Sequence, residues 1–250
     1  MRVRPHRPAG GRSIGPVDAI CFDWDGTLVD SLDTFYRANA AVMAELGLPF
    51  DRAAYRRHYA PDWRVLYGRL GIAEADLDAA HERWRRHFDP AEVHPFPGTA
   101  DALETLRRAG HRLAVVTATI RAVAEPQLRA FGLEELIAVR VFGDELATHK
   151  PDPAPLQLAL GRLGLDGDTS AVAYVGDAPD DMRMARRAGI HAVGIEGMLA
   201  DRDTLLAAGA DEVVTSVPAW VRSLTMSTAQ TLPDTAGAHG PRTDGRGGGR

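Results

Sequence analysis

The sequence is poor in both cysteine and lysine. Among its 250 residues there is one cysteine and one lysine, so the 29 basic residues include 28 arginines. Cys21 cannot form a disulfide within the chain, and its apolar neighbours indicate a buried structural side chain rather than a nucleophile. Lys150 offers a compact ammonium where arginine would offer a planar fork. Either this position requires a lysine, or the rarity of lysine reflects only a coding bias.

Long apolar runs and basic tracts are also absent. No apolar run approaches the roughly 20 residues of a membrane-spanning helix, and no apolar segment typical of a secretory signal follows the first arginines. We therefore expect a cytoplasmic protein with no membrane partner. The formal net charge is −5 and the body of the chain has no basic tract, which argues against a nucleic-acid partner. An anionic ligand would need local positive charge or a metal ion.

The two ends of the chain differ in composition from the rest. Residues 1–16 combine arginine, proline and glycine, and residues 223–250 are rich in serine, threonine, glycine and proline. Because both segments offer few apolar groups to bury, we predict a disordered N-terminal arm and a disordered C-terminal tail.

Between the ends, apolar segments alternate with helical patterns. The predicted strands are 17–22, 113–117, 138–142, 171–175, 191–195 and 212–215. The predicted helices between and after them are 98–109, 121–131, 153–164, 179–188 and 201–208. Near-continuous apolar strands that alternate with helices are typical of a parallel sheet covered on both faces. The pattern predicts an α/β fold with a doubly wound parallel sheet.

Residues 31–96 contain helical patterns but no convincing strand. Trp63, Leu66 and Tyr67 recur at helical spacing, which favours the core of a small helical bundle over a cofactor-binding motif. We therefore predict an α/β core formed by residues 17–30 and 97–222. An all-helical cap of residues 31–96 would be inserted into it after the first strand.

Two carboxylates follow the first predicted strand, in the segment DWDGT. Asp23 and Asp25 stand at the end of a strand, which is where open α/β sheets bind their ligands. Such a pair can divide its roles, because one carboxylate can attack as a nucleophile while the other transfers a proton. An acidic turn after a strand is the alternative interpretation, and Gly26 suits a tight turn in either case.

Two further strands end in residues that suit an oxyanion. The hydroxyl of Thr117 can donate to a bound anion, or it can cap the helix that follows. Lys150 lies in the loop HKPDP, where prolines restrain the backbone, and it can neutralise a phosphate together with a nearby carboxylate. His149 is the other candidate in this loop, but a lone loop histidine is more often a surface group.

A cluster of carboxylates follows the fourth predicted strand, in VGDAPDD. Oxygen ligands from a few carboxylates, a carbonyl and water are what Mg²⁺ prefers. Asp180 or Asp181 can instead cap the helix that begins near Pro179, whereas a helix cap does not explain Asp177. The segment is therefore a candidate magnesium site.

Taken together, these segments resemble the motifs of the haloacid dehalogenase-like superfamily, in its branch of small phosphatases with a helical cap. The resemblance covers roughly residues 17–220 and depends on the order and spacing of four segments, DWDGTLVDS, VVTAT, HKPDP and VGDAPDD. Each segment is weak alone, but the ordered combination is specific. It implies a Rossmann-like core with an inserted helical cap and a Mg²⁺-dependent phosphatase of a small phosphorylated metabolite, either phosphoglycolate-like or a sugar phosphate.

The resemblance also implies how the reaction would proceed. Asp23 would attack phosphorus as the nucleophile and form an aspartyl-phosphate intermediate, while Asp25 would act as general acid and then general base. Thr117 and Lys150 would hold the phosphoryl oxygens, and Lys150 would also pair with Asp23. Members of this family often have a polar residue after the threonine, where this chain has Ala118, so the backbone amide of Ala118 would bind substrate instead.

A metal site is implied in the same way. Mg²⁺ would be bound by Asp23, the main-chain carbonyl of Asp25 and Asp177, with Asp181 as a further ligand or a water-mediated support. Some relatives carry an acidic residue directly before the equivalent of Asp177, where this chain has Gly176. The metal would then depend more on Asp181 or on water.

Substrate specificity is expected to lie in the cap. There, Arg64 is a candidate for binding a carboxylate or second anionic group through its bidentate fork, unless it lies on a solvated face. A β-phosphoglucomutase-like phosphomutase shares the four motifs and stays an alternative, as do a pyrophosphatase and a non-catalytic binding protein on the same fold. The sequence leaves open the substrate, and whether the chain is a monomer or a homodimer.

Overall fold

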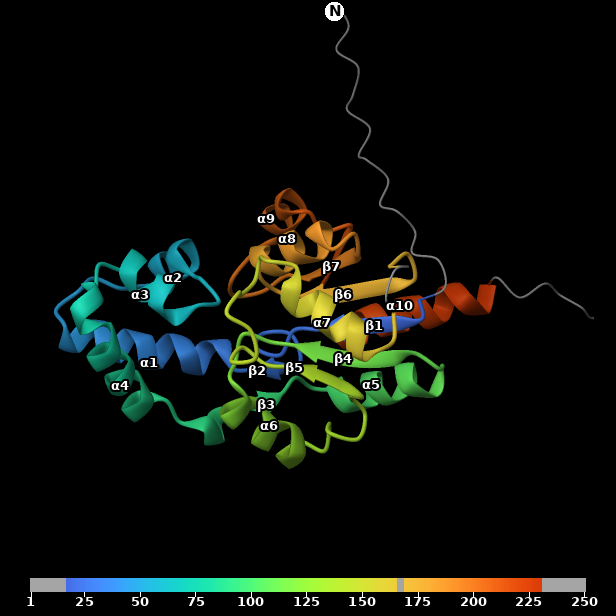
Figure 1. Cartoon of the computed structure of the whole chain (residues 1–250), viewed down its shortest axis with the longest axis horizontal. Helices are drawn as coiled ribbons and strands as arrows, with labels where there is room; N and C mark the ends of the chain where they lie inside the picture. Colours follow the sequence, from blue (N-terminus) through green and yellow to red (C-terminus); the bar gives the residue numbers. More distant parts are fainter. Residues whose placement is uncertain (1–16, 166–168, 231–250) are drawn as a thin grey trace, which may run out of the picture.

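The chain folds around a six-stranded parallel sheet, shown in Figure 1. The computed structural model describes residues 17–165 and 169–230. In spatial order the strands are β5 (Val139–Val141), β4 (Arg112–Val116), β1 (Ala19–Phe22), β6 (Val172–Gly176), β7 (His191–Ile195) and β8 (Glu212–Val214). The chain thus adds strands on one side of β1 and then on the other, which confirms the predicted doubly wound α/β sheet.

The central strand β1 explains why the sheet is buried on both faces. All four of its residues are fully buried, and its side chains alternate between two separate hydrophobic clusters. Ile20 and Phe22 face one cluster, whereas Ala19 and Cys21 face the other. Burial raises the pKa of the Cys21 thiol to about 12, which agrees with a structural rather than a nucleophilic cysteine.

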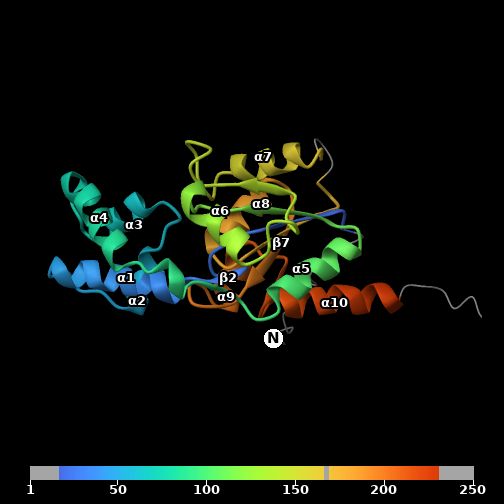
Figure 2. The same cartoon turned by 90° about the horizontal axis from the view of Figure 1, so that it is seen from below.

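Helices cover both faces of the sheet, as the alternating sequence pattern predicts. One face is covered by α5 (Thr99–Arg108), α6 (Arg121–Ala130) and α10 (Val217–Gln230). The other is covered by α7 (Ala154–Arg162), α8 (Pro179–Arg187) and α9 (Arg202–Ala208). Figure 2 shows α5 and α10 side by side, although they are far apart in the sequence. The result is a three-layer core with the sheet in the middle.

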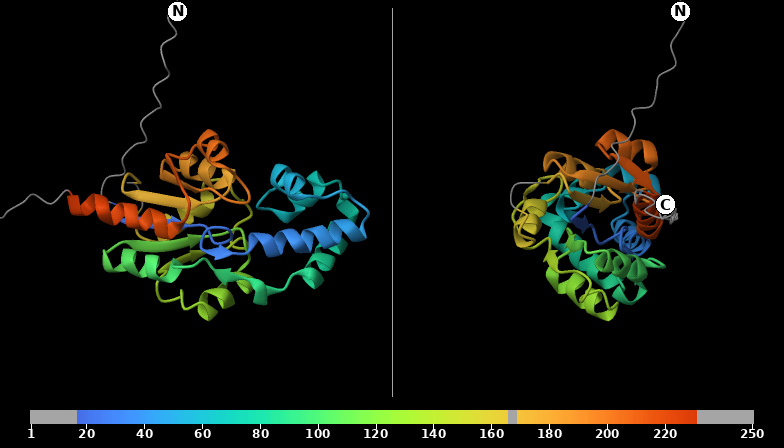
Figure 3. Two further views of the ribbon diagram at one scale, coloured as in Figure 1. Left: turned by 180° about the vertical axis from the view of Figure 1, so that it is seen from behind. Right: turned by 90° about the vertical axis from the view of Figure 1, so that its right-hand side faces the viewer.

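The inserted segment forms a group of helices beyond one end of the sheet, as Figure 3 shows. It leaves the core through β2 (Val29–Asp30) and returns through β3 (His94–Pro95), which pair antiparallel. Its helices are α1 (Leu32–Glu45), α2 (Arg52–His58), α3 (Trp63–Arg69) and α4 (Leu77–His87), with short 3-10 turns at Glu74–Asp76 and Pro90–Glu92. The side chains of Asp51 and Asp62 cap α2 and α3 by accepting hydrogen bonds from backbone amides.

The C-terminal tail begins later than the sequence predicted. Helix α10 continues to Gln230, so the prediction of disorder from residue 223 is wrong for residues 223–230. Val217, Trp220 and Val221, in the first turns of α10, are buried in the core, and Leu224 packs against the same cluster, so the helix that begins before residue 223 continues past it. Residues 1–16 and 231–250, for which disorder was also predicted, lie outside the described residues.

Three other expectations concern the chain as a whole. Among the residues described, no helix combines the length and the apolar character needed to cross a bilayer. The overall architecture, an α/β core with a helical cap after the first strand, is confirmed. The domain boundaries of 17–30 plus 97–222 and 31–96 stay a prediction.

Candidate active site

The carboxyl ends of three neighbouring strands bring the candidate residues together. Asp23 and Asp25 follow β1, Thr117 follows β4 and Asp177 follows β6, and these strands lie side by side as β4-β1-β6. Because the strands are parallel, their carboxyl ends share one edge of the sheet. The loop between β5 and α7 adds Lys150 at the same edge. Segments spread over more than half of the sequence therefore form one site.

The only lysine of the chain lies between the carboxylates of Asp23 and Asp181. Lys150 Nζ is 2.6 Å from Oδ1 of Asp23 and 2.8 Å from Oδ1 of Asp181. Burial alone would lower the pKa of Lys150, but the charges of Asp181 and Asp23 outweigh burial and raise it. The ammonium therefore stays charged. His149, the alternative candidate in this loop, is half-buried and does not join the pair of contacts.

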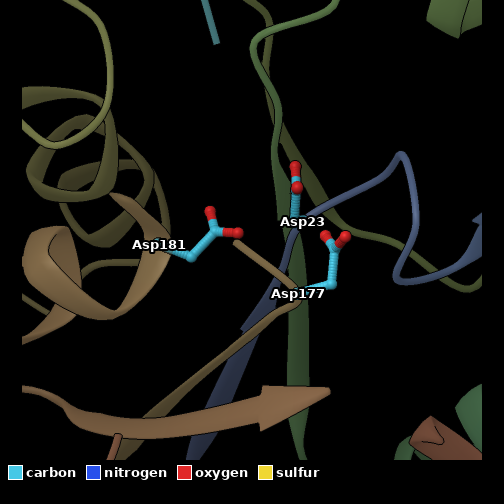
Figure 4. A group of neighbouring side chains, drawn as sticks. All are labelled: Asp23, Asp177 and Asp181. Atoms are coloured by element: carbon cyan, nitrogen blue, oxygen red, sulfur yellow. The ribbon is translucent and has the colours of Figure 1, made fainter. Parts of the chain in front are cut away.

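Three carboxylates gather around one point. Oxygens of Asp23, Asp177 and Asp181 lie within 4.8 Å of one another, and Figure 4 shows these groups facing a shared space. Burial is the main reason why the pKa of Asp23 is raised to about 7, with Lys150 opposing and Asp181 reinforcing the effect. The pKa of Asp177 is also raised, first by burial and then by Asp23 and Asp181. One lysine does not neutralise this concentration of negative charge.

The acidic cluster fits a divalent metal ion. Oδ2 of Asp177 is buried and has no hydrogen-bond partner within residues 17–165 and 169–230, while Oδ1 accepts a 3.3 Å hydrogen bond from Thr27. A buried acceptor left without a partner is costly unless something else binds it. Hard cations such as Mg²⁺ take carboxylate oxygens of this kind. The donor set of Asp23, Asp177 and Asp181 is therefore suited to magnesium.

Asp25 occupies a different environment from the acidic cluster. One of its oxygens accepts a 2.7 Å hydrogen bond from the Ser31 hydroxyl, and the other accepts one of 2.5 Å from Thr119. Burial raises the pKa of Asp25, although these two hydroxyls oppose the change. Ser31 and Thr119 were assigned no role of their own from the sequence, although they are the last residues of the segments DWDGTLVDS and VVTAT. Their hydroxyls fix the position of the Asp25 carboxyl group.

Thr117 lines the same site but does not cap the next helix. Helix α6 has Ile120 at its N-cap, so the alternative role proposed for Thr117 does not apply. Its hydroxyl oxygen instead accepts a 3.0 Å hydrogen bond from the amide of Thr119, which leaves the hydroxyl hydrogen available to donate. Ala118 also lines the site. A Cβ at position 143, after β5, would lie 1.9 Å from the carbonyl oxygen of Ala118, so only glycine fits at this position.

Two glycines of the motifs allow the carboxylates to approach the backbone. Gly26 has a φ of +75°, and a Cβ there would lie 2.4 Å from Oδ2 of Asp177. A Cβ at Gly176 would lie 2.5 Å from the carboxyl carbon of Asp181. An acidic side chain at position 176 therefore has no room while Asp181 keeps this position.

The two oxygens of Asp181 make different contacts. Its Oδ2 accepts a 3.0 Å hydrogen bond from the amide of Ala178 at the start of α8, as a helix cap does. Its Oδ1 faces Lys150 and accepts a 3.1 Å hydrogen bond from the hydroxyl of Tyr174. Tyr174 lies in the buried strand β6, and no motif marked it as a functional residue. Its hydroxyl fixes the carboxylate on which Lys150 depends.

A cavity of about 480 Å³ opens above these residues, between the strand ends and the cap helices. Asp23, Asp25, Thr117, Lys150 and Asp181 line its core side. Its cap side is lined mainly by rings, from Phe35, Tyr55, Tyr59, Trp63, Tyr67, His81 and Trp84. Burial, the largest cause, raises the pKa of Tyr55 and Tyr59, so their hydroxyls stay protonated. The cap helices therefore complete the site.

The structure does not bring Arg64 into this cavity. Its guanidinium lies 2.6 Å from Asp78, stacks over the Trp63 ring at 4.6 Å, and is nearly half exposed. Arg85, one helix later, lines the cavity instead. Helical periodicity does not reveal which arginine of the cap faces the core, and the sequence reasoning therefore missed Arg85.

Comparisons with known proteins identify the family of the chain. The chain matches the model of the haloacid dehalogenase-like hydrolase family over residues 20–195. It is 36% identical to a plasmid phosphoglycolate phosphatase of Cupriavidus necator, over 84% of this chain and 94% of the relative. The phosphoglycolate phosphatase of Rhodospirillum rubrum is also 36% identical, over 70% of this chain and 78% of its own length.

A solved structure is similar to this chain in fold and in sequence. CbbY from Rhodobacter sphaeroides, solved in complex with phosphate, superposes with a TM-score of 0.66 and 29% identity, over 80% of this chain and 95% of that one. The motifs, the fold and the family match coincide over the same residues. The chain therefore belongs to the haloacid dehalogenase-like hydrolase family.

Proposed function

We propose that the chain is a Mg²⁺-dependent phosphatase that hydrolyses a phosphate monoester through an aspartyl-phosphate intermediate on Asp23. The observation that carries this proposal is the pairing of Lys150 with Asp23 beside a second, separately held carboxyl group, Asp25. A carboxylate beside a buried ammonium can attack phosphorus, and a neighbouring carboxyl group can handle the proton. The names of the relatives from Cupriavidus necator and Rhodospirillum rubrum, both phosphoglycolate phosphatases, support the phosphatase class.

The first half of the reaction transfers the phosphoryl group to the protein. Lys150, the Thr117 hydroxyl and the amide of Ala118 hold the phosphoryl oxygens while an oxygen of Asp23 attacks phosphorus. The bond between phosphorus and the ester oxygen breaks, and Asp25 gives its proton to the departing oxygen. Burial suits Asp25 to this role, because it raises the pKa of the carboxyl group.

The second half of the reaction releases phosphate. Asp25, now a carboxylate, takes a proton from water as the water oxygen attacks phosphorus. The acyl-phosphate bond to Asp23 breaks, so inorganic phosphate leaves and the carboxylate of Asp23 is restored. The hydroxyls of Ser31 and Thr119 hold Asp25 in one position through both proton transfers.

Magnesium would be held by Asp23, the main-chain carbonyl of Asp25, Asp177 and Asp181, the last as a ligand or through water. When bound, the ion supplies positive charge that offsets the charge of the carboxylates and of the phosphoryl oxygens. The unpartnered oxygen of Asp177 supports this assignment.

The substrate class proposed from the family is a small phosphorylated metabolite. A panel of phosphoglycolate, sugar phosphates, nucleotides and pyrophosphate, assayed for phosphate release with Mg²⁺, tests the proposal. We expect release from at least one monoester by the wild-type protein and none by Asp23→Asn, which keeps the size of the side chain. Isomerisation of a sugar phosphate without net phosphate release would favour a phosphomutase, and release only from pyrophosphate a pyrophosphatase. If the Asp23→Asn variant is fully active, the nucleophile is misassigned.

A further inference from the structure

The two sides of the active-site cavity differ in chemistry. The core side carries the carboxylates, Lys150 and Thr117, whereas seven aromatic or imidazole rings line the cap side. The core side also has an apolar rim, formed by Ile120 and Val123 at the start of α6. Ile120 is 48% exposed, which is unusual for a large aliphatic side chain in this protein. A ligand that fills the cavity therefore meets polar groups at one end and apolar surface at the other.

Part of the cap side is an ordered stack of rings. His81 lies between Trp63, at 4.2 Å and 16° between ring planes, and Trp84, at 5.7 Å and 7°. Trp84 in turn stacks on Phe88 at 4.6 Å and 11°. Burial and the nearby Arg85 lower the pKa of His81, so the middle ring is neutral near pH 7. The stack fixes the orientation of the two indoles that border the cavity.

The charges around the cavity do not suit a small substrate that carries a carboxylate in addition to its phosphate, as phosphoglycolate does. A carboxylate on the substrate would need a cation on the cap side. Of the cavity-lining residues in the described part of the chain, Lys150 already contacts two carboxylates and Arg85 is paired with Glu82 at 3.3 Å. The side chain of Arg85 is also 65% exposed, so it lies at the edge of the cavity. A two-carbon acid would leave the ring-lined part of the space empty.

The size of the cavity suits a larger ligand. Its volume of about 480 Å³ falls within the roughly 300–1,000 Å³ of pockets that bind compounds the size of a drug. Planar rings bind to such walls because offset or edge-on contacts with aromatic side chains stabilise them beyond the burial of area alone. The wall is also preorganised, since each indole already packs against another ring.

We propose that the substrate is a phosphate monoester whose alcohol part carries a planar aromatic ring, bound against Trp63 and Trp84 while its phosphate reaches Asp23. This inference rests on the proposed phosphatase function of the same site and specifies its substrate class. Two classes of compound fit this description, aryl phosphates and nucleoside monophosphates. The test therefore includes both.

The experiment compares kcat/KM with Mg²⁺ for 1-naphthyl phosphate, adenosine 5′-monophosphate, phosphoglycolate and glucose 6-phosphate. We expect at least one ring-bearing ester to exceed phosphoglycolate by about tenfold or more, given the usual strength of aromatic contacts. Whichever ring-bearing ester is preferred identifies the source. A preference for phosphoglycolate or glucose 6-phosphate would overturn the inference and leave the phosphatase proposal intact.

Variants of the ring wall give a second readout. Trp84→Leu and Trp63→Leu keep an apolar side chain, and each should lower the ratio of kcat/KM for the ring-bearing ester to that for phosphoglycolate by about tenfold. Val65→Ala is the control. Val65 follows Trp63 by two positions on α3, but its side chain is exposed and does not line the cavity. An unchanged ratio in both tryptophan variants would contradict the proposal. Their thermal unfolding midpoints show whether each variant is folded.

A binding measurement separates this inference from the phosphatase proposal. In calorimetric titrations of 1-naphthyl phosphate and of adenosine 5′-monophosphate into Asp23→Asn with Mg²⁺, at least one compound should bind, and Trp84→Leu, added to the same variant, should weaken that binding. If this binding is seen while the wild-type protein hydrolyses no ester, the phosphatase proposal fails and the ring site stands. If esters are hydrolysed but neither ring-bearing compound binds, the ring site fails alone.

Discussion

Nζ of Lys150 lies 2.6 Å from Oδ1 of Asp23, and both residues are more than nine-tenths buried. The same nitrogen contacts Asp181 at 2.8 Å, so the ammonium occupies the space between two carboxylates. A planar guanidinium needs more room and a different approach to each oxygen. The single lysine among 28 arginines thus stands where the compact shape of its charge matters.

Lys150→Arg is the sharpest test of this relationship. The charge survives but the compact ammonium does not, so we expect phosphatase activity to fall by about 10²–10³-fold, as when a preorganised oxyanion donor is lost. Measurement of kcat with the preferred ester checks this. The matched control is Arg183→Lys on α8, which changes arginine to lysine in an exposed pair with Asp180. Normal activity of Lys150→Arg would mean that the rarity of lysine reflects coding bias alone.

The role of Asp25 can be separated from that of the metal ligands. Asp25→Asn should slow turnover by about 10²–10⁴-fold, because it removes a proton donor and acceptor. Magnesium affinity should change little, since the proposed ligand at this position is the main-chain carbonyl. Calorimetric titration of Mg²⁺ into the variant and the wild-type protein gives that comparison. A collapse of affinity would mean that the side chain of Asp25 itself binds the ion.

The main helices and strands could be predicted because they depend on local sequence. The four motifs can be read in the sequence directly. Buried strands such as β1 are short apolar runs, and the ends of parallel strands meet at one edge whatever packs around them. The family resemblance implied that Asp23 and Lys150, 127 residues apart, would pair, and their side chains are in contact. The fold and the core of the site follow from patterns that a sequence displays directly.

The remaining contacts depend on packing that no local pattern records. The hydroxyl of Tyr174 reaches Asp181 only because β6 and α8 lie at a particular distance. Arg64 and Arg85 stand on neighbouring cap helices, and only the relative rotation of those helices decides which one faces the cavity. The disordered tail was placed too early because composition outweighed the apolar spacing of Trp220 and Leu224.

Magnesium should stabilise the folded protein through Asp177. The crowded carboxylates repel one another without a cation, so saturating Mg²⁺ should raise the unfolding midpoint above that measured with EDTA. Asp177→Asn removes one charge of the cluster and the oxygen that lacks a partner. We expect this variant to lose most of the Mg²⁺-dependent increase and to be at least as stable as wild type in EDTA. Scanning calorimetry in both buffers makes the comparison, and an equal increase in the two proteins would exclude Asp177 as a ligand.

Acid should weaken a contact far from the active site, between β8, β7 and α10. Oε1 of Glu212 lies 3.1 Å from Nε2 of His191 and accepts a 2.9 Å hydrogen bond from the Trp220 indole. The hydrogen bond with His191 lowers the pKa of Glu212 most, burial opposes it and Trp220 reinforces it. A carboxylate whose pKa is lowered on folding stabilises the protein above its unfolded pKa, here the ordinary value of 4.5, and loses that effect as pH falls through the folded pKa.

Glu212→Gln should therefore destabilise the protein near neutral pH but not in acid. We expect a loss of about 1 kcal/mol in unfolding free energy at pH 7, typical of a partly exposed hydrogen bond to a charged group. The difference from wild type should shrink as pH falls below 4.5, because Glu212 then becomes protonated in the wild-type protein too. Urea unfolding at pH 7, 5 and 3.5 measures it, with Glu196→Gln as the control because that side chain is exposed. A difference that stays constant over this range would show that shape, rather than the charge of Glu212, stabilises the contact between β8 and α10.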